Sequence, residues 1–449
     1  MTTPIANFVK KYANTSALRL HMPGHKGKSF LGCESLDITE VSGADVLYNS
    51  SGIIAESEQN AATLFGTKST IYSAEGSSLC IRAMLKLVEM YAKKEAKRPL
   101  IAAGRNAHKV FLTTAALLDL EVDWLYGQNS GSILSTKITA EYLRDYLDKA
   151  LQKPVAVYIT SPDYLGNVTD IAAISKVCKE YGILLLVDNA HGAYLKFLPQ
   201  DIHPITLGAD ICCDSAHKTL PALTGAAYLQ ISKSAPEFFS VYAETAMSLF
   251  ASTSPSYLIL QSLDLLNVYL AEGYREKLAD FIKKINELKE NLCKLGFTLV
   301  GDEALKLTIA SKSYGYEGVE LAKELRNKNI ECEFADPDFV VLMLTPEIDL
   351  NDIDYLQNVL ASIKRKQEIT SHPPVLSPAR KRKSLKEAMF SPSQNLAVDK
   401  CEGKILASPS VNCPPAVPIV ISGEEIDKEK INCFKYYGID TCFVVDDKF

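Results

Sequence analysis

The chain has 449 residues, more than one domain normally holds, and 47% of them are hydrophobic, which is enough for a large buried core. Its formal net charge of -6 gives no reason to expect nucleic acid or an anionic membrane as a partner. The N-terminus lacks the apolar stretch of a secretory signal, and no run approaches about eighteen apolar residues, so neither a secretory signal nor a transmembrane helix is expected. The 11 cysteines form no CxxC pair, so we expect reduced thiols in the cytoplasm.

Residues 1–50 are expected to form an N-terminal arm, with a short amphipathic helix followed by the loop "HMPGHKG". From 51 to 265, short apolar runs such as "STIYS", "PVAVYIT" and "ILLLVD" alternate with helical patterns. Continuous apolar runs are typical of parallel strands that are buried on both faces. The alternation therefore predicts a large, mostly parallel, doubly wound α/β sheet domain, with a site at the carboxyl ends of its strands.

A long helical stretch is predicted at about 257–295, and residues 266–365 are expected to form a smaller α+β domain. Residues 366–449 are predicted to be a linker and a C-terminal subdomain with short strands. The basic run "ARKRKSL" in this region is interpreted as the solvated start of a helix rather than as a targeting signal.

Polar clusters stand at the ends of two of the strand-like runs. Lys218 follows "ADICCDS", and Ser215 and His217 beside it indicate an anion site, although a surface position is the default for a lysine. A lysine amine forms Schiff bases with carbonyl cofactors such as pyridoxal 5'-phosphate (PLP). Asp188 ends "ILLLVD", where a buried charge needs a partner, and the protonated pyridine nitrogen of PLP would be one.

A third cluster, Gly76, Ser77 and Ser78, lies between a predicted strand and a predicted helix. Backbone N–H groups at a helix N-terminus bind phosphate, and the two hydroxyls add donors. By itself this turn is also consistent with an ordinary helix cap. Together with Asp188 and Lys218, in this chain order, it favours a PLP site.

The ordered set resembles the Orn/Lys/Arg decarboxylases, PLP enzymes of the aspartate aminotransferase fold, which is fold type I. The likeness runs through "LHMPGHKGKSF", "AATLFGTKSTIYSAEGSS", "GRNAHKV", "ITSPDYLGNVTDI", "LLLVDNAHGAYLKF", "GADICCDSAHKTLPALTGAAYL", "STSPSYLIL" and "CPPAVPIVISGEEI". The likeness covers nearly the whole chain. The chain is similar to the shorter members of the family, which lack an amino-terminal wing.

The resemblance implies a role for each of these positions. Lys218 would form the Schiff base, Asp188 would pair with the pyridine nitrogen, His108 would stack on the ring, and Ala190 would pack on the opposite face. The phosphate contacts would come from Gly76, Ser77, Ser78, Ser215 and His217, and from Thr253 or Ser254 of a neighbouring subunit. The site would then be shared in a homodimer or a larger homo-oligomer.

The reaction that the resemblance implies is decarboxylation of a basic amino acid to an amine and CO2, with arginine preferred over lysine or ornithine, in a polyamine-related role. Lys218 or His108 would return a proton to the α-carbon. Asp45, Glu75 and Glu424 are candidate acidic partners for the substrate side chain.

The chain departs from the family pattern at several positions: Glu75 beside the phosphate turn, Val110 after "HK", and Cys413 and Ala416 in the tail. The changes at Glu75 and Val110 keep open the alternative of a catalytically silent homologue that binds or regulates a partner. A separate alternative is an aminotransferase or another lyase on the same scaffold. No metal is expected, because Pro and Gly between His21 and His25 keep the pair off a common helix face.

Overall fold

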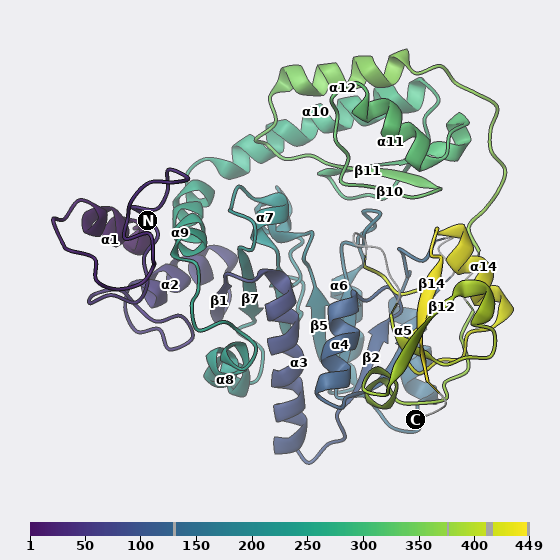
Figure 1. The fold of residues 1–449 in the computed structure, drawn as a ribbon, viewed down its shortest axis with the longest axis horizontal. Helices are drawn as coiled ribbons and strands as arrows, with labels where there is room; N and C mark the ends of the chain where they lie inside the picture. Colours follow the sequence, from purple (N-terminus) through teal and green to yellow (C-terminus); the bar gives the residue numbers. More distant parts are fainter. Residues whose placement is uncertain (129–131, 375–376, 410–415, 447–449) are drawn as a thin grey trace. The chain divides into compact units, whose positions relative to one another are not determined.

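The structure is a computed structural model that describes residues 1–128, 132–374, 377–409 and 416–446. The chain forms two compact units, and Figure 1 labels many of their helices and strands. Unit 1 comprises Met1–Lys97 and Leu184–Ala279, and unit 2 comprises Arg98–Ile183 and Asp280–Phe449. Each unit is therefore assembled from two stretches that lie far apart in the sequence.

Unit 1 contains α1 (Pro4–Ala13), α2 (Ile53–Phe65), β1 (Ser69–Ser73), α3 (Gly76–Lys94), β5 (Leu184–Asp188), η1 (Ala193–Phe197), β6 (Ile211–Asp214), α7 (Ala216–Thr219), β7 (Ala227–Ile231), α8 (Glu237–Ser248) and α9 (Tyr257–Ala271). Helix α10 (Tyr274–Lys294) leads from unit 1 into unit 2. The predicted helical stretch is thus two helices, separated at Gly273, whose positive φ of 79° is accessible to glycine at little cost.

The strands of unit 1 follow the order β1-β7-β6-β5, and all residues of β5, β6 and β7 are buried. β5 and β6 run parallel, as predicted, with Asp188 opposite Cys213. β7 is antiparallel to both β6 and β1. The sequence did not reveal this direction, because an apolar run indicates burial on both faces and not strand direction. Since β5 and β6 are parallel, the turns that follow them emerge at the same edge.

Unit 2 begins with β2 (Leu100–Gly104), α4 (Lys109–Leu117), β3 (Glu121–Leu125), α5 (Ala140–Lys149), β4 (Ala156–Thr160) and α6 (Ile171–Glu180). The strands β4-β2-β3 are parallel to one another, as predicted for this sheet. It continues with β8 (Leu299–Val300), β9 (Lys306–Ala310), η2 (Ser311–Tyr314), α11 (Gly318–Arg326), β10 (Phe334–Ala335), β11 (Phe339–Met343) and α12 (Leu350–Ser362). The strands β10-β11-β9-β8 form an antiparallel sheet.

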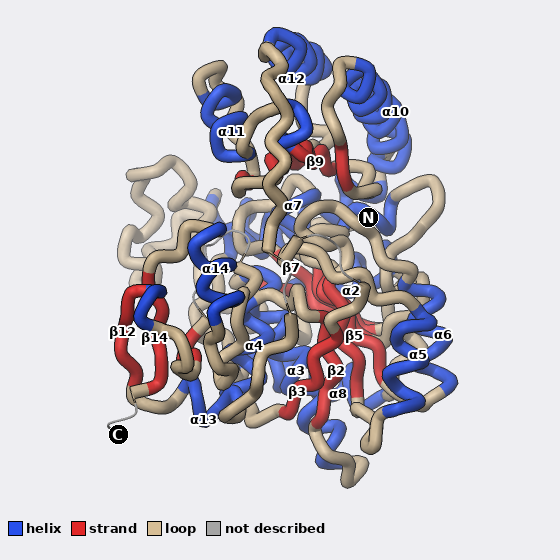
Figure 2. The backbone as a smooth tube through the Cα atoms, turned by 90° about the vertical axis from the view of Figure 1, so that its right-hand side faces the viewer, coloured by secondary structure: helices blue, strands red, loops and turns tan. Residues whose placement is uncertain are grey.

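The C-terminal part of unit 2 contains α13 (Leu385–Met389), β12 (Ser393–Ala397), η3 (Val398–Lys400), β13 (Leu406–Ser408), α14 (Lys428–Tyr436) and β14 (Thr441–Val445). β12, β14 and β13 form the antiparallel sheet seen beside α13 and α14 in Figure 2. The basic run leads into α13, whose N-cap Ser384 forms a capping box with Glu387, so this helix start is confirmed.

Among the described residues, no helix has both the length and the hydropathy needed to cross a bilayer.

Candidate active site

Lys218 and His191 meet at the edge where β5 and β6 end. Lys218 lies in α7, directly after β6, and His191 lies three residues beyond β5. The Lys218 Nζ atom is 3.1 Å from His191 Nε2, and the His191 side chain is only 6% exposed. Sequence reasoning predicted Lys218 but missed His191, although that residue stands in the same "VDNAHG" stretch as Asp188.

Asp188 is the last residue of β5 and is 3% exposed. Its Oδ1 atom accepts a hydrogen bond from the backbone N–H of Ala190 at 3.2 Å and lies 3.5 Å from the Cys213 sulfur on the neighbouring strand. A buried carboxylate in this position fits the protonated ring nitrogen of PLP, since a buried charge is stable only beside an opposite charge or several donors.

The predicted phosphate turn forms the N-terminus of α3. Gly76 has a φ of 71°, and a Cβ atom built there would meet nothing within 4 Å, so the turn faces open space. Glu75 precedes the helix without capping it through its side chain, and Ser215 Oγ donates to Ser77 Oγ at 2.8 Å. The structure thus brings Ser77 and Ser215 together at the start of a helix of 19 residues, and this arrangement fits a phosphate group.

His217 is held by its own loop. Its Nδ1 donates to the carbonyl oxygen of Ala226 at 2.8 Å, and burial lowers its pKa, so the ring is neutral at physiological pH. Its predicted contact with phosphate would have to use Nε2, because Nδ1 already has a partner.

Glu75 does not stand as an isolated charge beside the phosphate turn. Its side chain accepts a hydrogen bond from the backbone N–H of Ser252 at 2.7 Å, and this contact holds the loop after α8. Thr253 and Ser254 follow in this loop and are exposed within the single chain. Their contact with a neighbouring subunit stays a prediction.

His108 belongs to unit 2, where it is the N-cap of α4 and its Nδ1 accepts the backbone N–H of Val110 at 3.2 Å. The cap orients the imidazole ring. Val110, one of the departures from the family pattern, is 7% exposed and lies in the core. Stacking of His108 on the cofactor stays a prediction.

A buried polar network behind the site was not predicted. The Asp214 carboxylate, at the end of β6, accepts from Asn189 Nδ2 at 2.6 Å and from Gln230 Nε2 at 3.0 Å, and His203 Nε2 lies 3.1 Å away. All four side chains are fully buried. Because Asn189 stands between Asp188 and Ala190, the network fixes the turn that carries the predicted ring contacts.

The three acids considered for the substrate side chain all have structural partners. Both Asp45 oxygens accept backbone N–H groups around the start of α2; burial opposes ionisation there, but these donors outweigh it and lower the pKa. Glu424, in unit 2, accepts the N–H of Ile421 at 2.8 Å, and burial raises its pKa.

Among the loop histidines, His25 pairs with Asp37 at 3.2 Å. Cys413 lies outside the described residues.

Comparison with known proteins identifies the family of the chain. The sequence model described as "Orn/Lys/Arg decarboxylase, major domain" matches residues 3–355, and that family's C-terminal domain matches residues 364–443. An arginine decarboxylase of Bacillus subtilis is 28% identical over 96% of this chain and 92% of its own length. Among solved structures, the lysine decarboxylase of Francisella novicida has a TM-score of 0.79 at 16% identity, covering 99% of this chain and 81% of that one.

A serine palmitoyltransferase of Sphingomonas wittichii matches with a TM-score of 0.56 at 15% identity over 80% of this chain and 83% of its own. The likeness to the solved structures shows the predicted fold, that of the type I PLP enzymes.

Proposed function

This chain belongs to the Orn/Lys/Arg decarboxylase family of PLP-dependent enzymes, and we propose that it releases CO2 from a basic amino acid, with arginine as its preferred substrate. The product would be the corresponding amine, and its further use would belong to polyamine chemistry. We place the enzyme in the cytoplasm, where the ten cysteines among the described residues would stay reduced thiols.

The observation that carries the proposal is the convergence within unit 1 of Lys218, Asp188 and the Ser77–Ser215 pair. Bound PLP supplies an electron sink for the electron pair that CO2 leaves behind on the α-carbon. The Lys218 amine would hold the cofactor covalently, and the buried Asp188 carboxylate would keep its ring nitrogen protonated. The Ser77 and Ser215 hydroxyls and the N-terminus of α3 would hold its phosphate.

Proton movement at the α-carbon falls to Lys218, His191 or His108. The 3.1 Å contact between Lys218 Nζ and His191 Nε2 makes this pair a route by which a proton can pass from the imidazole to the amine. We keep His108 as the group that would stack on the ring and orient it, and Thr253 or Ser254 as the contact from the second subunit of a homodimer.

The preference for arginine is supported by the relatives that carry this activity in their names, such as the Bacillus subtilis protein. Asp45 and Glu75 already accept backbone donors, so neither is proposed as the partner of a guanidinium group.

The experiment is a panel of purified protein with added PLP and arginine, lysine or ornithine, with CO2 and amine measured separately. We expect CO2 and agmatine from arginine at the highest kcat/KM. A higher kcat/KM for lysine or ornithine would overturn the arginine preference. Keto acid without CO2 would indicate a transaminase, and no product from any of the three substrates would overturn the proposal.

A further inference from the structure

A pocket of about 580 Å³ in unit 2 is lined by residues that none of the roles above uses. Its walls come from three segments, 133–134, 319–337 and 417–439. The volume lies in the range of small-molecule sites, roughly 300–1,000 Å³.

Asp336 is the buried acid of this pocket. It lies in the turn between β10 and β11 and is 7% exposed. Its Oδ1 accepts the backbone N–H groups of Asp338 and Phe339 at 2.8 and 2.7 Å. Its Oδ2 is buried and, among the described residues, has no hydrogen-bond partner. An acceptor buried in this way costs free energy until a donor reaches it.

The cationic side chains near the pocket form ion pairs with carboxylates other than Asp336. Lys312 Nζ pairs with Asp338 Oδ1 at 2.8 Å, and Arg326 Nε pairs with Glu331 at 3.1 Å. Lys435 pairs with Asp399. Burial raises the pKa of Asp336 to about 6, even though its two backbone donors and the charge of Lys312 act to lower it, so the carboxylate is mostly ionised at pH 7.5.

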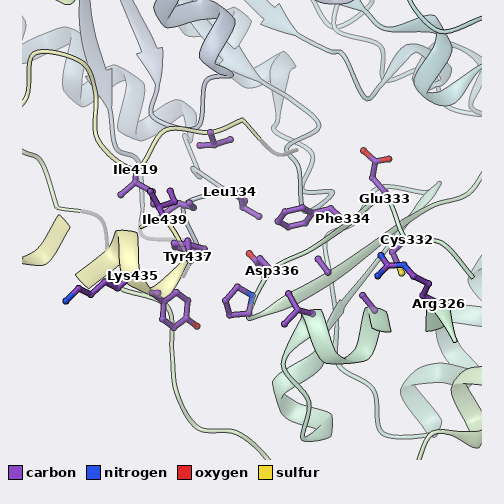
Figure 3. Close-up of a pocket in the computed structure, with 18 residues that line it drawn as sticks. Leu134, Arg326, Cys332, Glu333, Phe334, Asp336, Ile419, Lys435, Tyr437 and Ile439 are labelled. Carbon is purple, nitrogen blue, oxygen red and sulfur yellow. The ribbon is translucent and has the colours of Figure 1, made fainter. Parts of the chain in front are cut away.

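Apolar and aromatic side chains line the pocket together with Asp336, and the lining also includes the charged residues Arg326, Glu333 and Lys435. Figure 3 shows Asp336 together with Phe334, Leu134 and Tyr437 among the residues that line the pocket. A neighbouring ring, that of Tyr436, also lines the pocket and lies with its centroid 5.1 Å from that of Tyr437. Aromatic faces attract an ammonium group, and apolar walls accept a methylene stem.

We propose that this pocket binds a primary ammonium group carried on an aliphatic stem, with the ammonium donating to Asp336 Oδ2 and the stem lying against Phe334, Leu134 and Tyr437. The amine products of basic amino-acid decarboxylation belong to this ligand class. That link, which makes the pocket a site where product is sensed, rests on the proposed function.

The test is calorimetric titration of the PLP-saturated enzyme with 1,4-diaminobutane at pH 7.5. We expect the wild type to bind one more molecule of diaminobutane per chain than Asp336→Asn, which keeps the Oδ1 acceptor but loses the charge. If this additional molecule still binds weakly to the variant, its affinity should be at least about tenfold lower than in the wild type. Asp354→Asn, an exposed acid on α12 outside the pocket, is the matched control and should bind as the wild type does.

A second variant keeps the test decisive if Asp336→Asn folds poorly. Val319 lines the pocket but is 49% exposed, so Val319→Trp should fill the pocket without disturbing the core and remove the same equivalent. Uncharged 1,4-butanediol should not bind. Equal binding of diaminobutane by all variants, equal binding of butanediol, or no extra equivalent in the wild type would overturn the proposal.

This result is separate from that of the substrate panel. Unchanged binding in Asp336→Asn removes the ammonium site and leaves the decarboxylase proposal intact. Failure of the substrate panel removes the link to product and leaves the ammonium site.

Discussion

Glu58 is a buried carboxyl group whose protonation makes the stability of the protein depend on pH. It lies on the buried face of α2, and its Oε1 accepts the backbone N–H of Tyr72 at 2.9 Å. Tyr72 is in β1, the strand that leads into the phosphate turn. Burial raises the pKa of Glu58 from 4.5 to about 8. The folded protein therefore keeps a proton here that the unfolded chain releases near pH 4.5.

The sign and size follow from proton linkage. Between about pH 4.5 and 8 the folded state binds more protons than the unfolded state at this position, so stability falls as pH rises, by about 1.4 kcal/mol per pH unit. The stabilising effect is fully present below pH 4.5 and is lost through pH 8. Glu58→Gln removes this dependence and keeps an oxygen to accept from Tyr72.

The assay is the thermal midpoint of wild type and Glu58→Gln at pH 5 and pH 7.5. The difference between the two proteins should change by about 3 kcal/mol in favour of the variant, which is roughly 6–12 °C for a unit of this size. Glu56→Gln, on the exposed face of α2, is the control for removing a carboxylate without burial. A difference that stays constant between the two pH values would refute the reasoning, since Glu58 would then titrate alike in both states.

Three further predictions concern the site. Lys218→Ala should abolish CO2 release and the visible absorbance of bound PLP, whereas Lys233→Ala, exposed just after β7, should keep both. His191→Phe removes the contact with Lys218 and should lower kcat by about 10²-fold or more while PLP content is retained; a pH profile that keeps its shape and height would contradict this role. Gly192→Ala would place a Cβ 2.0 Å from Asn189 Oδ1, so we expect about 1–3 kcal/mol of destabilisation and weaker PLP binding, measured as thermal midpoints with and without PLP.

Much of the candidate site could be predicted because its indicators are local. Asp188 ends an apolar run, Lys218 stands among small polar residues after another, and Gly76 begins a turn before a helix. Each pattern spans a few residues, and their order along the chain carried the resemblance to a family. The substrate acids were harder, because a carboxylate looks the same in sequence whether it binds a ligand or, like Asp45, a ring of backbone N–H groups.

The sequence alone was sufficient for the α/β class and the family, and it predicted which lysine would bind the cofactor covalently and which acid would face the ring nitrogen. Only the tertiary structure decided which residues surround them. His191 meets Lys218 across 27 residues because β5 and β6 are parallel and end at one edge. Asp336 is left with an unpartnered oxygen because the nearby Lys312 pairs with Asp338. Composition and periodicity indicate which segments are buried. The contact partners of each side chain depend on the register of the strands and on the packing of the turns, and no short stretch of sequence specifies either of these.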